Sequence, residues 1–394
     1  MLPVQPIHPF PARMAPELAL REIQQLPKRA TVLDPMMGSG TVLRVAIDCG
    51  LRAIGRDVDP LAVLMTRVWT TPIDTKLFRE RAVHVLHTAR NMCAEHISLP
   101  WIDEDPETSA YIDFWFGKQQ KVDLRKLSSL IIGIPGPEGE ALRIALSRII
   151  VTKKVGASLA HDVSHSRPHK VLRDNSFAVL DGFWYSVSQV AKRLETYPIQ
   201  EQADVRQEDT RNLTSITSTS VDAVITSPPY LNAIDYLRGH RLALVWLGYR
   251  VGELRPIRSS SIGAERAPEG QADTHLTEEI IDQMGLGELL PRREQRLITR
   301  YILDLFAMLL EIHRVLCPGG RVIFVIGNSC LHGVFIRNAL AIILLAERIG
   351  FKRVREEERE LPPNRRYLPP PSVSEQTDLN KRMRTETVLT FVRE

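Results

Sequence analysis

A Ser-Pro-Pro-Tyr tetrad is the part of the sequence best suited to chemistry. The run VDAVITSPPY, residues 221–230, predicts a buried strand that ends at Ser227. The Ser227 hydroxyl and the Pro228 carbonyl are two acceptors for the N–H groups of an exocyclic amine on a nucleobase, and such bonds free the amine lone pair that the ring otherwise delocalises. Pro229 stiffens the loop, and Tyr230 offers a flat face for a stacked base. A Pro-Pro turn alone is common and structural, whereas the flanking serine and tyrosine favour a site.

A glycine-rich corner earlier in the chain has the pattern of a ligand site. Asp34 ends a predicted strand, Gly38 and Gly40 form a turn, and Thr41 begins a predicted helix. The bare backbone and the free N–H groups of a helix N-terminus let a ligand touch the main chain. Asp57 ends the next predicted strand, where it can accept hydrogen bonds from ribose hydroxyls. The sequence GSGT lacks the third glycine of GxGxxG, which disfavours a nicotinamide cofactor.

Strands and helices alternate around the two motifs as in a doubly wound α/β fold. A strand at 30–34, a helix from Thr41 to Cys49 and a strand at 52–57 open the pattern. The pattern resumes after residue 220 with strands at 221–226 and 319–329, helices at 301–316 and 335–350, and an antiparallel hairpin from 351–363 and 385–394. We therefore expect a Rossmann-like parallel sheet, closed by that hairpin and interrupted by a largely helical insertion.

Three segments are predicted along the chain. Residues 1–73 form the first part of the core, 74–200 a helical insertion, and 201–394 the second part of the core, with an irregular insertion at 250–297. Between positions 118 and 173 there are eleven Lys and Arg residues against four Asp and Glu residues, a local charge of +7 compared with +4 for the whole chain. This excess favours nucleic-acid binding by the insertion over a merely solvated helical face.

The composition is that of an ordinary globular protein. The 394 residues are 44% hydrophobic and 25% charged, which argues against a disordered or fibrous chain. No apolar run reaches the roughly 18 residues of a membrane span, and the N-terminal residues lack the layout of an export signal. Four scattered cysteines without a CxxC pair disfavour a disulfide scaffold or a zinc ribbon. We therefore expect a cytoplasmic protein with no membrane partner.

Together, DPMMGSGT and TSPPY resemble motifs of the amino-methylating DNA methyltransferases, which modify cytosine N4 or adenine N6 with S-adenosyl-L-methionine. The segment HPFPARMAPELA, residues 8–19, is similar to one that lines the methionine end of the cofactor in this family. The resemblance covers residues 5–70 and 203–340 and implies the sheet of a S-adenosylmethionine-dependent methyltransferase.

The resemblance also assigns roles to individual residues. Asp34 and the two glycines would hold the methionine part of the cofactor, Asp57 the ribose, Asp209 the adenine amine and Arg13 the carboxylate. Met36 stands where the family usually has phenylalanine, an apolar exchange. The whole predicted cofactor set is Arg13, Asp34, Pro35, Met36, Gly38, Gly40, Thr41, Asp57 and Asp209, and the predicted catalytic set is Ser227, Pro228, Pro229 and Tyr230.

The implied function is a site-specific DNA methyltransferase of the restriction-modification kind, acting on a base flipped out of double-stranded DNA. In the family, Ser-Pro-Pro-Tyr is found mostly with cytosine N4 and Asp-Pro-Pro-Tyr with adenine N6, so cytosine N4 is favoured. Three alternatives remain open: an adenine N6 enzyme, an RNA methyltransferase of the tRNA guanine-N2 type, and a non-catalytic DNA-binding subunit. A cognate restriction enzyme or defence-system partner and association with the nucleoid would accompany the favoured function.

Other chemistry-bearing residues carry weaker signals. Three histidines lie four residues apart at 161, 165 and 169, but a proline just before the last breaks the helix that would align them, so we expect no metal site. Cys317 precedes a proline, the reverse of the Pro-Cys order of cytosine C5 enzymes, which indicates a structural role. The run NRRYLPPP at 364–371 is either a second DNA-facing loop or a surface lid.

Overall fold

The computed structural model describes residues 6–10, 14–93, 95, 97–152, 155–160, 170, 172, 174–231, 236–263, 274–287, 289–331, 334–361 and 385–394. Its strands are β1 (Thr31–Asp34), β2 (Arg52–Asp57), β3 (Asp204–Gln207), β4 (Val221–Thr226), β5 (Leu316–Gly327), β6 (Ser329–Leu331), β7 (Val334–Ile336), β8 (Phe351–Glu360) and β9 (Thr385–Arg393). Its helices are α1 (Pro16–Ile23), α2 (Thr41–Asp48), α3 (Pro60–Trp69), α4 (Thr75–Asn91), α5 (Pro100–Asp103), α6 (Pro106–Trp115), α7 (Lys118–Ile132), α8 (Gly136–Ile150), α9 (Val179–Thr196), α10 (Tyr236–Leu244), α11 (Val251–Ser260), α12 (Thr274–Gln283), α13 (Arg292–Val315) and α14 (Asn338–Ile349).

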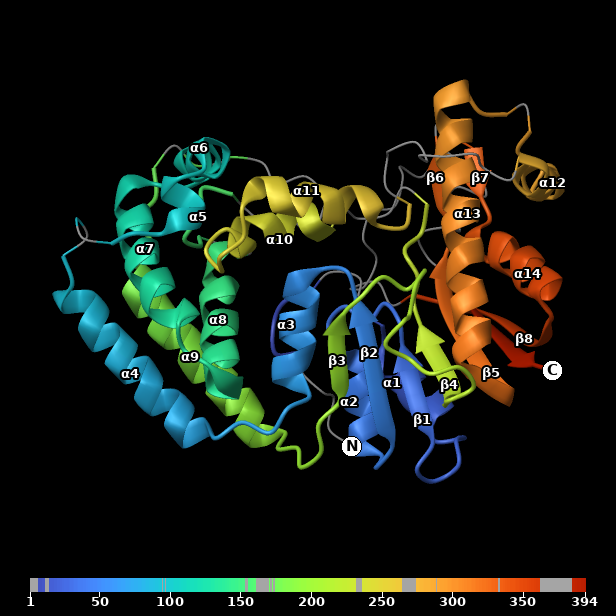
Figure 1. Ribbon diagram of the computed structural model, residues 1–394, viewed down its shortest axis with the longest axis horizontal. Helices are drawn as coiled ribbons and strands as arrows, with labels where there is room; N and C mark the ends of the chain where they lie inside the picture. The colour runs from blue at the N-terminus through green and yellow to red at the C-terminus, as the bar shows by residue number, and fades with distance from the viewer. Residues whose placement is uncertain are drawn as a thin grey trace.

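A seven-stranded sheet in the order β3-β2-β1-β4-β5-β9-β8 forms the centre of the molecule (Figure 1). The first five strands in this order are parallel, and β9 is antiparallel to both β5 and β8. This arrangement confirms the predicted doubly wound α/β fold and its closing hairpin. The strand order reverses between β1 and β4, which is where folds of this kind bind their ligands.

Apolar side chains on both faces of the sheet pack against helices, so both faces are buried. Val32 and Ile225 face a core shared with α1 and α2, whereas their neighbours Leu33 and Val224 face a core shared with α13 and α14. Successive side chains of a strand point to opposite faces, so a strand covered on both sides needs apolar residues throughout. Helices on the two faces therefore hold the strand ends in fixed positions.

A separate helical lobe lies beside the sheet (Figure 1). Its core contains the fully buried Phe78 of α4, Leu124 of α7, Leu142 of α8 and Val187 of α9. Residues of α3 and α10 belong to the same core, so the lobe is built from more than the segment between β2 and β3. No helix in the described ranges is both long enough and apolar enough to span a bilayer.

The region 250–297, which we predicted to be irregular, is partly helical in the structure. It contains α11, α12 and the first turn of α13, which begins nine residues before the predicted start at 301. In α13 an apolar stripe at helical spacing runs through Ile298, Ile302 and Leu305 and so begins before the predicted start, and the residues before Ile298 continue the same helix. Charged residues between these positions obscured the stripe in the sequence.

The glycine turn before α2 generates a first prediction. Gly40 has a φ of +75°, and a Cβ there would lie 2.8 Å from Thr66, whereas Gly50 has a φ of +72° with nothing within 4 Å of its Cβ position. We expect Gly50→Ala to cost about 1 kcal/mol through backbone strain alone. We expect Gly40→Ala to lower the free energy of unfolding by about 1–3 kcal/mol more than Gly50→Ala does, because the Thr66 side chain must also move. Urea unfolding of both variants measures this difference, and equal losses would contradict it.

Candidate active site

The two sequence motifs meet at the carboxyl ends of β1 and β4. These strands are paired in parallel, with Val32 opposite Ala223 and Leu33 opposite Val224. The Thr226 hydroxyl donates a 2.7 Å hydrogen bond to Oδ1 of Asp34, and both side chains are buried. The residue before the Ser-Pro-Pro-Tyr tetrad is therefore hydrogen bonded directly to the residue that opens the glycine corner.

The glycine corner is also tied to the end of β2. Gly38, with a φ of +49°, donates its N–H to Oδ2 of Asp57 at 2.9 Å, and Met37 donates to the Arg56 carbonyl at 3.0 Å. A Cβ on Gly38 would lie 3.1 Å from the Phe10 ring, so the turn and the N-terminal segment approach each other closely. Together with the pairing of β1 and β2, in which Asp34 lies opposite Gly55, these contacts place Asp34, Gly38 and Asp57 around one corner.

Burial changes the acidity of both carboxylates at this corner. Desolvation raises the pKa of Asp34 to about 7. The hydrogen bonds from Thr226 and from the Met36 N–H lower this pKa, but desolvation outweighs them. Desolvation and the neighbouring charge of Asp59 raise the pKa of Asp57 to about 6. Asp57 is thus mostly ionised at neutral pH, and its carboxylate accepts N–H groups from Gly38 and Asp59, one on each oxygen. Each oxygen keeps acceptor capacity for a hydroxyl.

The Ser-Pro-Pro-Tyr tetrad is held in place by β5 and α13. The Ser227 hydroxyl donates a 2.8 Å bond to the Val325 carbonyl of β5, which commits its proton and leaves its oxygen as an acceptor. The Tyr301 hydroxyl of α13 donates to the Pro229 carbonyl at 3.1 Å, and burial raises the pKa of Tyr301, so it stays a neutral donor.

Gly327, the last residue of β5, makes room for the tyrosine of the tetrad. A Cβ there would lie 2.8 Å from Cε2 and 3.1 Å from Cζ of Tyr230. The ring therefore lies directly against bare backbone, and any larger residue would push it away. This contact sets the position of the Tyr230 ring.

The remaining predicted residues lie around the same corner. Met36 donates its N–H to Asp34 at 3.2 Å, Pro35 lies between these two residues in the chain, and Thr41 is the buried first residue of α2. Asp209 follows Glu208, whose N–H donates to the Asp57 carbonyl at 3.1 Å. Its carboxylate is bound by the Arg211 side chain, so a cofactor amine would share Asp209 with that guanidinium. Arg13, and the predicted features at 161–169 and 364–371, lie outside the described residues.

Four residues of this region were not predicted as site residues: Phe10, Thr226, Tyr301 and Gly327. The sequence carried a signal for two of them: Phe10 lies within HPFPARMAPELA, and Thr226 directly precedes the Ser-Pro-Pro-Tyr tetrad. Gly327 ends an apolar run, where a glycine indicates close approach of another group. Tyr301 lies in the middle of a long helix and carried no local signal.

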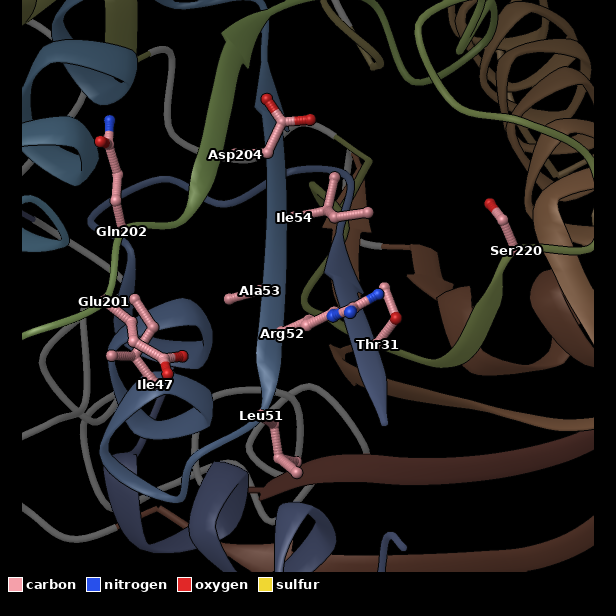
Figure 2. Close-up of a pocket in the computed structure, with 10 residues that line it drawn as sticks. All are labelled: Thr31, Ile47, Leu51, Arg52, Ala53, Ile54, Glu201, Gln202, Asp204 and Ser220. Atoms are coloured by element: carbon pink, nitrogen blue, oxygen red, sulfur yellow. The ribbon is translucent and has the colours of Figure 1, made fainter. Parts of the chain in front are cut away.

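Other candidate features lie away from this edge. Cys317 lies at the amino end of β5, the opposite end from Ser227, and donates its thiol to the Thr219 carbonyl at 3.1 Å, which agrees with a structural role. Among the described residues there is no group of three potential metal ligands. An open hollow lies at the starts of β1 and β2, lined by Thr31, Arg52 and Asp204 among others (Figure 2). Because it contains none of the predicted residues and lies at the wrong end of the strands, it is not this site.

A doubly wound sheet with a glycine corner, a buried carboxylate at the end of β2 and a polar tetrad at its switch point defines a Rossmann-like protein with a candidate nucleotide-cofactor site.

No family model matches the chain. Type II methyltransferase M.MvaI of Kocuria varians is 32% identical over 129 residues, which cover 32% of this chain and only 28% of the relative. Type II methyltransferase M.BsoBI of Geobacillus stearothermophilus is 22% identical over 392 residues, covering 84% of this chain and 74% of the relative. These similarities confirm the resemblance to bacterial DNA methyltransferases.

Among solved structures, a candidate DNA modification methylase from Thermus thermophilus, complexed with S-adenosyl-L-methionine, is 17% identical over 47% of this chain and 53% of its own, with a TM-score of 0.24.

The buried Asp34 carboxyl generates a second prediction. Its native pKa of about 7 exceeds the ordinary 3.8, so the folded state holds an extra proton between these values. The free energy of unfolding therefore falls as the pH rises from about 4 to about 7. Asp34→Asn keeps an acceptor for Thr226 but does not titrate. Over this window we expect the free energy of unfolding to fall by on the order of 3 kcal/mol more in the wild type than in this variant. Urea unfolding across the window tests this, and parallel pH profiles would contradict it.

Proposed function

We propose that the protein is a DNA methyltransferase that uses S-adenosyl-L-methionine to methylate the exocyclic amine of a flipped base, with cytosine N4 as the favoured target. The observation that carries the proposal is the state of Ser227. The Ser227 hydroxyl donates its hydrogen bond to the Val325 carbonyl, so the Ser227 oxygen can act toward a ligand only as an acceptor. Orienting an amine requires such an acceptor. The similarity to type II methyltransferases supports DNA over RNA as the substrate.

The residues of the glycine corner fit the proposed cofactor. Glycines of positive φ leave main chain uncovered at the start of α2, and Phe10 closes one side of the turn. Asp57 would hold the ribose hydroxyls, Asp34, Gly38 and Gly40 the methionine part, and Asp209 the adenine amine. When bound, S-adenosyl-L-methionine supplies an electrophilic methyl group.

The chain itself supplies orientation and electrostatics. Ser227 and the Pro228 carbonyl accept the two N–H groups of the target amine and turn its lone pair out of the ring plane. Tyr230 stacks on the flipped base, and the Tyr301 bond to Pro229 keeps the loop from moving. The mechanism needs no covalent bond between enzyme and base.

We assign DNA binding to the helical lobe and the loops near the tetrad. The basic segment 118–173 supplies most of the charge for phosphate contacts. The choice of cytosine over adenine rests on the serine of the tetrad. A cognate restriction enzyme is part of the same proposal.

A direct test identifies the modified base. We expect incubation with S-adenosyl-L-methionine and unmethylated bacterial DNA, followed by nucleoside mass spectrometry, to yield N4-methylcytosine. Ser227→Ala should lower the methylation rate by about 10²-fold, because one orienting acceptor is lost. Cofactor affinity should not change. N6-methyladenine would keep the chemistry and contradict the target base, and wild-type rates in both Ser227→Ala and Tyr230→Ala would contradict the assigned loop.

A variant of Gly327 tests the role of the Tyr230 ring without replacing any residue of the tetrad. We expect Gly327→Ala to lower methylation by about 10-fold or more, because the new methyl group displaces the Tyr230 ring and about 1–3 kcal/mol of base stacking is at stake. Gly133→Ala is the control, since nothing lies within 4 Å of its Cβ position. Steady-state methylation and thermal unfolding separate the two effects. Equal rates for both variants would show that the ring position does not matter.

A further inference from the structure

A buried imidazole–carboxylate pair joins α10 to the turn after β2. Nδ1 of His240 is hydrogen bonded to Oδ2 of Asp59, across 181 positions in the sequence. His240 is 8% exposed and Asp59 is 6% exposed. Neither residue belongs to a predicted set. A buried polar pair of this kind is costly to separate, because the partner left behind is unsatisfied.

Asp59 passes this contact on to the candidate ribose site. Its other oxygen, Oδ1, accepts the Leu61 N–H at 2.9 Å and caps α3. Its own N–H donates to Oδ1 of Asp57 at 2.9 Å. Because Asp57 also binds the Gly38 N–H, a continuous chain of hydrogen bonds runs from His240 to the glycine turn.

Aromatic packing connects the same helix to the other side of the glycine turn. The Phe10 ring stacks on Tyr236 of α10, with centroids 5.0 Å apart and planes 18° apart. It also lies 5.5 Å from the His240 ring. Since Phe10 contacts Gly38 as well, α10 reaches the cofactor corner by two independent routes.

Five residues separate the end of the catalytic tetrad at Tyr230 from the start of α10 at Tyr236. We propose that His240 is a positioning residue for the cofactor, which acts through Asp59 to hold Asp57 in place for the ribose hydroxyls. This inference rests on the proposed function. It also assigns α10 a second task, because the helix that continues from the catalytic loop then fixes part of the cofactor site.

The test compares three replacements of His240. Asparagine places an amide nitrogen near the position of Nδ1, glutamine places it near Nε2, and leucine removes the donor. Isothermal titration with S-adenosyl-L-methionine should show a dissociation constant within about 3-fold of wild type for His240→Asn, and at least 10-fold weaker for His240→Gln and His240→Leu. A tenfold change corresponds to about 1.4 kcal/mol. In methylation assays the weaker variants should raise KM for the cofactor far more than they lower kcat.

The outcomes separate the inference from the function on which it rests. Equal affinity in wild type and His240→Leu, or equal loss in His240→Asn and His240→Gln, would overturn the positioning role while leaving the methyltransferase intact. If wild type itself binds no cofactor, the proposed function fails and the inference fails with it. Thermal unfolding without cofactor identifies a variant that does not fold. In that case the comparison of Asn with Gln, which have the same functional group, decides the question.

Discussion

The hydrogen bond from the Thr226 hydroxyl to the Asp34 carboxylate is the junction on which the site depends. A buried carboxylate needs donors, and Asp34 receives them from Thr226 on β4 and from the Met36 N–H of its own turn. One carboxylate therefore fixes the end of the strand that leads into the tetrad and the turn that leads into α2. Because β1 and β4 are far apart in the chain and become neighbours where the strand order of the doubly wound sheet reverses, this junction exists only once these two strands have paired.

Carboxylates converge at this edge without an equal number of basic side chains. Asp34, Asp57 and Asp59 are satisfied mainly by backbone N–H groups, by a hydroxyl and by His240. Backbone donors are fixed in direction and do not titrate, so they hold carboxylates in place without neutralising them. Burial raises the pKa values of Asp34 and Asp57, and the backbone donors lower them only in part. Within the part of the chain that the structure describes, these carboxyl groups therefore remain acceptors without a cationic partner such as the one that Asp209 has in Arg211.

Local sequence predicted most strands of the sheet, helix α2 and the strand ends at which the predicted site residues lie. The strands and α2 follow from apolar runs and glycine stops, and the positions of Asp34, Gly38 and Asp57 follow from strand ends. Contacts between distant segments could not be predicted in this way. Tyr301 reaches Pro229 across 72 positions, and the Gly327–Tyr230 contact joins the end of β5 to the loop after β4, whose spacing only the folded sheet determines. Helices α11 and α12 were missed because polar residues interrupt their apolar stripes.

The composition of the helical lobe has a consequence for protein engineering. Its core draws on three separate stretches of chain: Ile7 near the N-terminus, the run of helices from α3 to α9, and the segment containing α10 and α11. A chimera that exchanged only residues 74–200 with a relative would combine two halves of different cores. Keeping the lobe core matched would thus need at least two coordinated grafts. The second graft would begin at α10, close to the Ser-Pro-Pro-Tyr tetrad, so the lobe could not be exchanged without altering the chain next to that tetrad.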